Sequence, residues 1–196
     1  VGSEMCIRDR VSEKEVTLER DECNRPSTNP EDLSGLNPVI ENGSITPGNA
    51  SQLSDGASAC VVMDRKLAEQ KGLQPMGVFR GLSVHGCEPD YMGLGPIGAT
   101  QKALDRASLT INDIGIVELN EAFASQAIYC MRELEMDPSK TNVNGSGISL
   151  GHPVGATGAI MTVKLIEELE TRDTEFGLVT MCVGGGQGVA TIFQRI

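Results

Sequence analysis

The chain has 196 residues and a formal net charge of −11, from 27 acidic and 16 basic side chains. This charge argues against binding to nucleic acid or to anionic membranes, because both attract basic surfaces. Apolar residues make up 39% of the chain and charged residues 22%, which is ordinary for a globular protein. No apolar run approaches the roughly 20 residues of a membrane-spanning helix, so we expect one or two domains with a buried core.

The cysteine and histidine side chains are too scattered in the sequence for a metal site. No two cysteines form a C-x-x-C motif, and His85 and His152 lie far apart. We therefore expect no bound metal and reduced thiols in the cytoplasm, since no secretory signal pattern opens the chain. The cysteines are Cys6, Cys23, Cys60, Cys87, Cys130 and Cys182.

The first fifty residues predict little regular structure. Residues 1–10 follow neither a helical nor a strand period and start without methionine, so we interpret them as a non-native leader and the chain as a fragment or a processed product. Residues 11–50 contain several prolines and many Asn and Ser residues, which favours an irregular segment with at most short elements.

A strand and a helix are predicted next. Residues 57–63 are apolar without polar alternation, which predicts a strand buried on both faces, with Cys60 as a small core residue. Residues 64–71 predict a short helix that ends at Gly72, because glycine is common directly after a helix C-terminus.

From residue 77 onward, predicted strands and helices alternate, which places this part in the α/β class. Two strands at 178–183 and 189–193 should pair as an antiparallel hairpin at one side of the sheet, joined by a glycine-rich turn. The other expected strands are 77–84, 114–119 and a short one at 142–143, and the expected helices are 96–107, 121–135 and a helix opened by Pro153 and running to about 166.

The first candidate site is the glycine-rich segment 144–153, NGSGISLGHP. His152 directly precedes the proline that should open a helix, so its ring would lie at the positive end of a helix dipole and stay neutral. A neutral imidazole can donate a hydrogen bond to a carbonyl oxygen. The alternative is a structural loop with a capping histidine. A dinucleotide site is disfavoured, because the glycine spacing is one residue too long for G-x-G-x-x-G.

The second candidate site is the segment 181–188, MCVGGGQG. Cys182 ends a strand directly before the glycine turn, where its thiolate could act as a nucleophile or a general base. The glycine N–H groups could form an oxyanion hole. The alternative is a buried strand cysteine before a hairpin turn. A phosphate-binding P-loop is excluded, since no Lys-Ser/Thr pair follows the glycines.

The third candidate site is the run 120–123, Asn-Glu-Ala-Phe, between a strand and a helix. On its own it has a simple structural interpretation, in which Asn120 is the N-cap of the helix. All three candidate sites lie at turns that follow strands or precede helices, where α/β proteins place their chemistry.

Taken in chain order, Asn-Glu-Ala-Phe, Gly-His-Pro and Cys-x-Gly-Gly-Gly-x-Gly resemble the C-terminal half of thiolases, which are the acetyl-CoA acetyltransferases and 3-ketoacyl-CoA thiolases. Two further stretches agree: residues 48–57, GNASQLSDGA, resemble the family's approach to a core strand, and residues 92–96, MGLGP, resemble its Met-Gly-x-Gly-Pro turn. The resemblance covers about residue 11 to the end. It implies an α/β fold with a thiolase-like C-terminal domain, whose mixed sheet has helices on both faces and forms one half of an αβαβα architecture.

The resemblance also implies a division of the chain. Residues 11–47 would be a remnant of the loop region that covers CoA. Residues 48–75 would be the last strand and helix of a missing N-terminal domain. Residues 76–196 would be the complete C-terminal domain.

By resemblance, the whole enzyme is an acyl-CoA C-acyltransferase that cleaves a 3-ketoacyl-CoA with CoA or runs the reverse Claisen condensation. Cys182 would move the proton between the CoA thiol and the α-carbon. His152 would activate the acyl-accepting cysteine and help to hold the thioester oxygen. Asn120 would hold a water that completes this oxyanion hole, and the N–H of Gly184 would contribute to a second hole.

The resemblance implies CoA as a substrate and no resident cofactor or metal. Ala50 and Ser51 match positions that touch the CoA pantetheine, and Met92 and Phe123 match positions in the acyl pocket. The expected partners are acyl-CoA and CoA, and the full-length enzyme is expected to be a homodimer or a homotetramer.

The acyl-accepting cysteine is the main departure from the family pattern. That cysteine lies in the first half of thiolases, and nothing in this chain matches its surroundings, so we expect a truncated chain that is inactive alone. Gly98 also stands where many relatives have a second proline. The alternatives are a ketoacyl-ACP synthase-like condensing enzyme, which shares the fold but usually lacks a cysteine at the position of Cys182, and a non-catalytic acyl-CoA-binding module.

Overall fold

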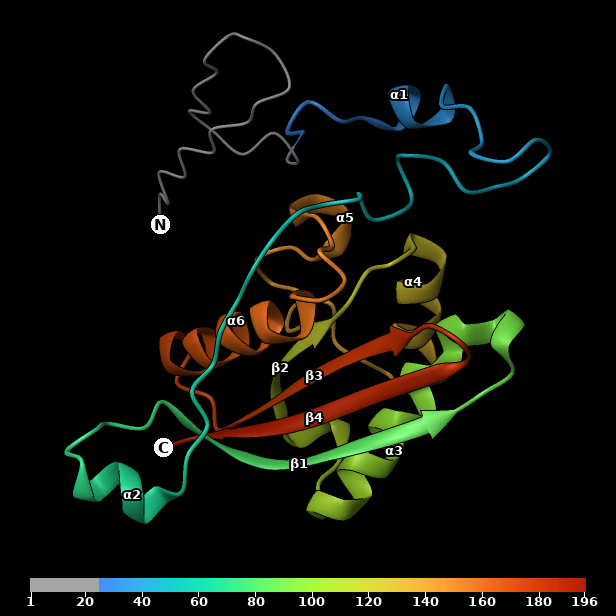
Figure 1. The fold of residues 1–196 in the computed structure, drawn as a ribbon. Helices are drawn as coiled ribbons and strands as arrows, with labels where there is room; N and C mark the ends of the chain where they lie inside the picture. The colour runs from blue at the N-terminus through green and yellow to red at the C-terminus, as the bar shows by residue number, and fades with distance from the viewer. Residues whose placement is uncertain (1–24) are drawn as a thin grey trace, which may run out of the picture.

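The computed structural model describes residues 25–196, so the predictions for residues 1–10 and 11–24 lie outside the described part. Its centre is a mixed four-stranded sheet in the order β1-β4-β3-β2 (Figure 1). β4 pairs antiparallel with both β1 and β3, whereas β2 pairs parallel with β3. The strands are β1 (Gly77–Gly86), β2 (Ile114–Leu119), β3 (Phe176–Val183) and β4 (Gln187–Arg195).

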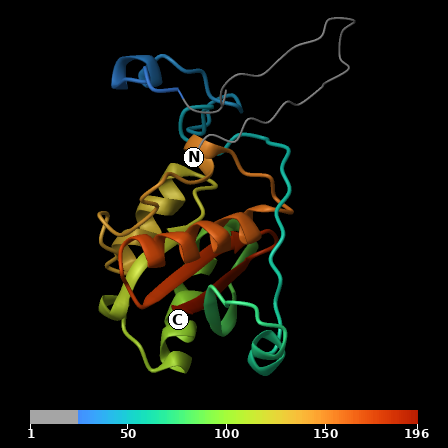
Figure 2. The ribbon, with the colours of Figure 1, turned by 90° about the vertical axis from the view of Figure 1, so that its left-hand side faces the viewer.

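Helices cover both faces of the sheet, which confirms the predicted α/β class. α3 (Gly95–Ala107) and α4 (Ala124–Glu133) lie on one face, and α6 (Thr157–Thr171) lies on the other. In Figure 2 the orange helix α6 faces the viewer with the strands behind it. No helix in the described range is long and apolar enough to cross a membrane. The short elements are η1 (Pro89–Leu94), η2 (Ile111–Asp113) and α5 (Gly147–Leu150).

Each face of the sheet has its own hydrophobic core. The larger core joins β2, β3 and β4 to α3 and α4, through fully buried side chains such as Leu119 and Leu178. The smaller core joins β2 and β3 to α6 through residues such as Leu165 and Val179. Because successive residues of a strand point to opposite faces, Leu178 and Val179 serve the two cores in turn.

The predicted C-terminal hairpin forms, but its predicted place in the sheet is wrong. β3 and β4 are the two central strands, since β1 adds to the outer side of β4 and β2 to the outer side of β3. A hairpin turn determines only that its two strands are neighbours, and it leaves both outer edges free for other strands. β1 in turn lies at the edge of the described sheet and leaves Phe79 54% exposed.

The prediction of a buried strand at residues 57–63 is wrong. This segment is extended but belongs to no strand, and Val61 and Val62 are each 85% exposed. Figure 1 shows it running past α6, where the Cys60 thiol lies 3.9 Å from the Ala159 carbonyl oxygen. Cys60 is exposed, so it is not a core residue either. An apolar run has strand preference, but it becomes a strand only where another strand completes its hydrogen bonds.

All but one of the remaining predicted elements are confirmed, with shifted ends. α2 (Arg65–Gln70) is capped by the Asp64 side chain, and Gly72 has a φ of 67° as expected after a helix end. The irregular segment up to residue 50 contains only α1 (Pro30–Ser34) among its described residues. The prediction of a short strand at 142–143 is wrong: neither residue belongs to a strand, and the nearest pairing is a single bridge between Val117 and Thr141.

Candidate functional site

The ends of the neighbouring strands β2 and β3 bring two of the three sequence motifs together. Asn120 directly follows β2, and its backbone N–H donates to the carbonyl oxygen of Thr180 on β3 at 3.0 Å. Cys182 lies two residues further along β3. Because β2 and β3 are parallel, both residues lie at the carboxyl edge of the sheet, where open α/β sheets bind ligands.

Asn120 also holds the remaining motif, the glycine-rich segment that contains His152, at this edge of the sheet. Its side chain is completely buried, and its Nδ2 lies 3.3 Å from Nε2 of His152. α4 begins at Ala124 with Phe123 as its N-cap, so the interpretation of Asn120 as an N-cap is wrong. Gly147 allows the close packing, because a Cβ there would lie 3.1 Å from Oδ1 of Asn120 and 2.8 Å from the carbonyl oxygen of Glu121.

The hydrogen bonds around His152 determine its tautomer. Nδ1 lies 2.7 Å from Oγ1 of Thr157, and that hydroxyl donates its hydrogen to the carbonyl oxygen of Pro153 at 3.0 Å. Oγ1 of Thr157 therefore accepts from Nδ1–H. Nε2 is then the unprotonated nitrogen, and it accepts from Nδ2 of Asn120. A neutral imidazole held this way presents Nε2 as a proton acceptor.

The predicted neutrality of His152 is supported, although its main physical cause is burial. Burial lowers the pKa of the imidazole below its ordinary value. The helix does not begin at Pro153: α6 starts at Thr157, and the segment between them is a turn. The ring nevertheless bonds to the first residue of α6, where the helix dipole also disfavours a positive charge.

This lowered pKa predicts a pH dependence of stability. In the unfolded chain the imidazole titrates near its usual pKa of about 6.5. As the pH falls through 6.5 toward the lower folded pKa, the unfolded chain binds more protons, so the free energy of unfolding decreases. We expect His152→Gln to flatten this part of the curve when unfolding is measured by urea from about pH 5 to pH 7.5. His85→Gln serves as the matched control, and equal slopes for His152→Gln and the parent would contradict the prediction.

Cys182 is a half-buried thiol that lies near other thiols. Burial is the largest cause that raises its pKa, and repulsion from Cys87 raises it further. The resting group at neutral pH is therefore the protonated thiol, which is a proton donor and becomes a base once it has lost its proton. Burial also raises the pKa of Cys130 to about 11, which suits an inert core thiol.

The turn after Cys182 presents backbone N–H groups at the same edge. Residues 184–186 join β3 to β4, and Gly185 and Gly186 have φ values of 80° and 82°, which favour glycine. The carbonyl oxygen of Gly186 accepts from the N–H of Cys87 at 2.7 Å, so the turn is fixed to the end of β1. Gly184 has open space where a Cβ would lie.

The proposed CoA-contacting residues lie beside the other motifs. Ala50 forms a bridge with Phe123, and the N–H of Ser51 donates to the carbonyl oxygen of Ala122 at 2.9 Å. Further along the same segment, Oγ of Ser54 accepts a hydrogen bond from the backbone N–H of His152 at 3.2 Å. Hydrogen bonds and a bridge therefore join three distant parts of the sequence, which are residues 50–54, residues 122–123 and His152.

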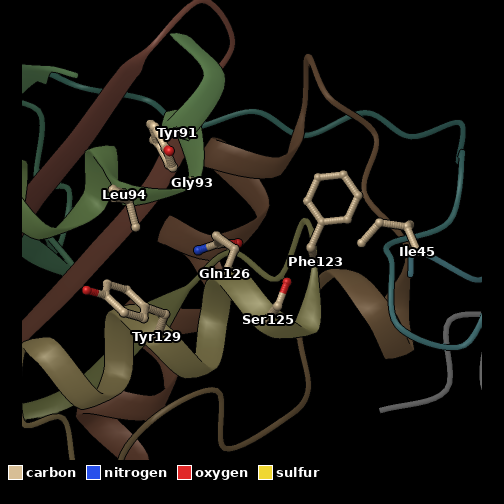
Figure 3. A pocket seen from close by; sticks show the side chains of 8 residues that line it. All are labelled: Ile45, Tyr91, Gly93, Leu94, Phe123, Ser125, Gln126 and Tyr129. Carbon is tan, nitrogen blue, oxygen red and sulfur yellow. The ribbon is translucent and has the colours of Figure 1, made fainter. Parts of the chain in front are cut away.

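A shallow apolar pocket of about 380 Å³ opens beside Phe123 (Figure 3). Its walls come from η1, α4 and the loop before Ala50, and they include both Phe123 and Tyr129. Met92 lies in η1 but is not among the residues that line this pocket, whereas its neighbours Tyr91 and Gly93 are. The other lining residues are Ile45, Leu94, Ser125 and Gln126.

Two positioning residues escaped the sequence analysis. Thr157 orients the His152 ring, and Asn142 donates and accepts hydrogen bonds with both backbone groups of Leu119 at 2.8 Å. The sequence did contain a signal for Thr157. This hydroxyl residue follows His152 by five positions and lies in the first turn of the next helix, where it can reach the imidazole ring. Between residues 25 and 196, no group of three His, Cys, Asp or Glu side chains gathers in a way that could hold a metal ion.

Comparison with known proteins gives matches over nearly the whole chain. The model of the thiolase C-terminal domain matches residues 73–195, and that of the thiolase N-terminal domain matches residues 4–66. Beta-ketothiolase BktB of Cupriavidus necator is 50% identical over 93% of this chain and 47% of its own length. The 3-ketoacyl-CoA thiolase of Bacillus subtilis has the same identity and the same coverage. The chain therefore spans about half the length of these relatives.

Solved structures agree with the sequence matches. The crystal structure of the Bacillus anthracis acetyl-CoA acetyltransferase matches with a TM-score of 0.89 and 45% identity, over 97% of this chain and 48% of that chain. Human mitochondrial 3-ketoacyl-CoA thiolase in complex with CoA matches with a TM-score of 0.84 and 41% identity, over 92% of this chain and 46% of that chain. The match to the thiolase C-terminal domain covers more than half of this chain. The chain belongs to the thiolase family.

Proposed function

We propose that this chain carries the proton-transfer half of a thiolase active site, within an acyl-CoA C-acyltransferase that cleaves a 3-ketoacyl-CoA with CoA or runs the reverse Claisen condensation. The observation that carries the proposal is the contact of Asn120 with His152 at 3.3 Å, beside the strand that ends in Cys182. The relatives support the substrate class, because their names include 3-ketoacyl-CoA thiolase and acetyl-CoA acetyltransferase.

In the cleavage direction, Nε2 of His152 takes the proton of the acyl-accepting thiol, and that sulfur attacks the 3-keto carbon. The C2–C3 bond breaks, and the electron pair forms an enolate of the remaining thioester. The Cys182 thiol protonates C2 of this enolate, and its thiolate then takes the proton of an incoming CoA thiol. The CoA sulfur attacks the acyl-enzyme thioester and releases the acyl-accepting cysteine as a thiolate, which takes back the proton from Nε2 of His152.

The fixed hydrogen-bond donors stabilise the enolate oxygen in this scheme. We assign one oxyanion hole to His152, once it carries the proton at Nε2, and to a water held by Asn120. The N–H of Gly184 contributes to the second hole. Each donor of this kind is worth on the order of 3 kcal/mol in the transition state. The raised pKa of Cys182 fits its role as the acid, since the resting group carries the proton.

We propose acyl-CoA and CoA as the ligands, bound through Ala50 and Ser51 at the pantetheine and through Met92 and Phe123 at the acyl group. The CoA complex of a related human thiolase supports CoA as a ligand. The proposed assembly of the whole enzyme is a homodimer or a homotetramer, and the proposed compartment is the cytoplasm, because the chemistry requires reduced thiols.

We also propose that the 196-residue chain alone does not complete the reaction, because no cysteine in it matches the surroundings of the acyl-accepting thiol. The test is thiolysis of acetoacetyl-CoA by the purified chain, followed as loss of the 3-ketoacyl-CoA absorbance. We expect no turnover. Turnover that Cys87→Ala abolishes would overturn this proposal and would identify Cys87 as the acyl acceptor.

A further inference from the structure

A partly buried lysine joins the strand before Asn120 to the loop before His152. Lys164 on α6 donates from Nζ to Oε2 of Glu118 at 2.9 Å and to the carbonyl oxygen of Gly145 at 2.6 Å. Its side chain is 19% exposed, and that of Glu118 is completely buried. Glu118 lies on β2, two residues before Asn120, and Gly145 lies in the glycine-rich loop that leads to His152.

The loop and the residues before it are attached to the end of β2 at several other points. Asn142 bonds to both backbone groups of Leu119 at 2.8 Å, and its Nδ2 also lies 3.0 Å from Oε1 of Glu121. Oγ of Ser146 donates to the same Leu119 carbonyl oxygen at 3.0 Å. The carbonyl of Gly145 faces Lys164 instead, so Lys164 is one contact through which α6 reaches this loop, beside Glu168, whose Oε1 accepts from Nδ2 of Asn144 at 2.5 Å.

The ion pair of Lys164 and Glu118 carries a desolvation cost that a pair of apolar side chains would not have. Burial raises the pKa of Glu118, and the carboxylates of Glu168 and Glu121 raise it further, while Lys164 lowers it. Oε1 of Glu118 is buried and has no hydrogen-bond partner within the described residues. Because well-packed apolar residues often replace a buried ion pair without loss of stability, the pair is better explained by the geometry that it enforces than by the stability that it adds.

We infer that Lys164 is a positioning residue, which sets the approach of His152 to Asn120 by tying the Gly145 loop to Glu118 and α6. The catalytic meaning of this inference rests on the proposed function, but the geometric claim does not. An ammonium group suits this task because it can donate to a carboxylate and to a backbone carbonyl at the same time.

The experiment uses ¹⁵N-labelled full chain and reads the imidazole signals by NMR. Only two histidines are present, so the His85→Gln variant assigns the His152 ring. In Lys164→Met we expect the Nε2 signal of His152 to move and its titration to shift upward toward the usual pKa of about 6.5, as the ring loses its buried contact. Amide hydrogens of residues 145–152 should exchange faster by about tenfold or more.

Two variants separate positioning from general destabilisation. Lys164→Arg keeps both donors and should restore the parent His152 signals. Leu169→Ala removes a buried side chain from the same helix and leaves the groups that form both Lys164 hydrogen bonds in place, so it should lower the melting temperature while leaving the His152 signals unchanged. If Lys164→Met does not fold, Lys164→Gln, which is too short to reach both acceptors, gives the same comparison.

A folded Lys164→Met or Lys164→Gln chain with parent-like His152 signals and titration would overturn the inference. So would His152 signals that move equally in Leu169→Ala, because the effect would then follow stability alone. These outcomes do not depend on thiolase chemistry. The proposed function would fail separately, if the chain did not catalyse proton transfer at an acyl-CoA α-carbon while the NMR results held.

Discussion

Replacing Cys182 with alanine is expected to abolish the exchange of α-hydrogens between acetyl-CoA and solvent. This half-reaction requires a base at C2, which we assign to Cys182, and a donor at the thioester oxygen, which we assign to the water held by Asn120, but no acyl-accepting thiol. The parent chain should therefore exchange these hydrogens in D₂O, observed by ¹H NMR, even though it does not complete thiolysis. Loss of a general base usually costs roughly 10²–10⁴-fold in rate, and we expect Cys182→Ala to fall to the uncatalysed rate.

The pH dependence and two control variants sharpen this prediction. Because burial raises the pKa of Cys182, the thiolate fraction and the enzyme-dependent rate should increase about tenfold per pH unit across the neutral range. Cys60→Ala removes an exposed thiol far along the chain and should exchange like the parent. Cys130→Ala tests the inert core thiol in the same way. A Cys182→Ala chain with parent-like exchange would remove Cys182 from the proposed mechanism.

Replacing Leu165 with alanine is expected to cause a large loss of stability. Leu165 is completely buried and lies at the centre of the core that holds α6 against β2 and β3. Leucine-to-alanine changes at such positions cost about 2–5 kcal/mol, because the surrounding side chains fill the cavity only in part. In a chain of this length the melting temperature should fall by about 5–15 °C, measured by calorimetry or circular dichroism.

A second substitution tests whether the cavity is the cause. A Cβ on Gly177 of β3 would lie 2.8 Å from Cγ and both methyl groups of Leu165, so Gly177→Ala alone should cost about 1–3 kcal/mol by overpacking. In Leu165→Ala the added methyl group enters the space that leucine left. The double variant should therefore be more stable than the sum of the single changes predicts, by about 1 kcal/mol or more. Additive losses would show that the two side chains do not share this space.

The sequence by itself determined most of the local structure and the family. The strand at 114–119 was predicted with the observed ends, because its residues combine a compact apolar run with turns on both sides. The helix predicted at 121–135 is observed at Ala124–Glu133, since its apolar spacing marks its length better than its first turn. The three motifs that contain Asn120, His152 and Cys182 were sufficient to indicate a thiolase, which the comparisons confirm.

Only the tertiary structure decided which of these residues meet. No local pattern places β3 and β4 at the centre of the sheet, because the order of strands depends on which edges the other strands occupy. No pattern shows that residues 57–63 lack a strand partner. The contact of Asn120 with His152 and the bonds from Lys164 to Glu118 and Gly145 join residues that are 19 to 46 positions apart. Such contacts form where packing brings polar groups together and burial makes an unpaired group costly, and neither condition can be read from spacing along the chain.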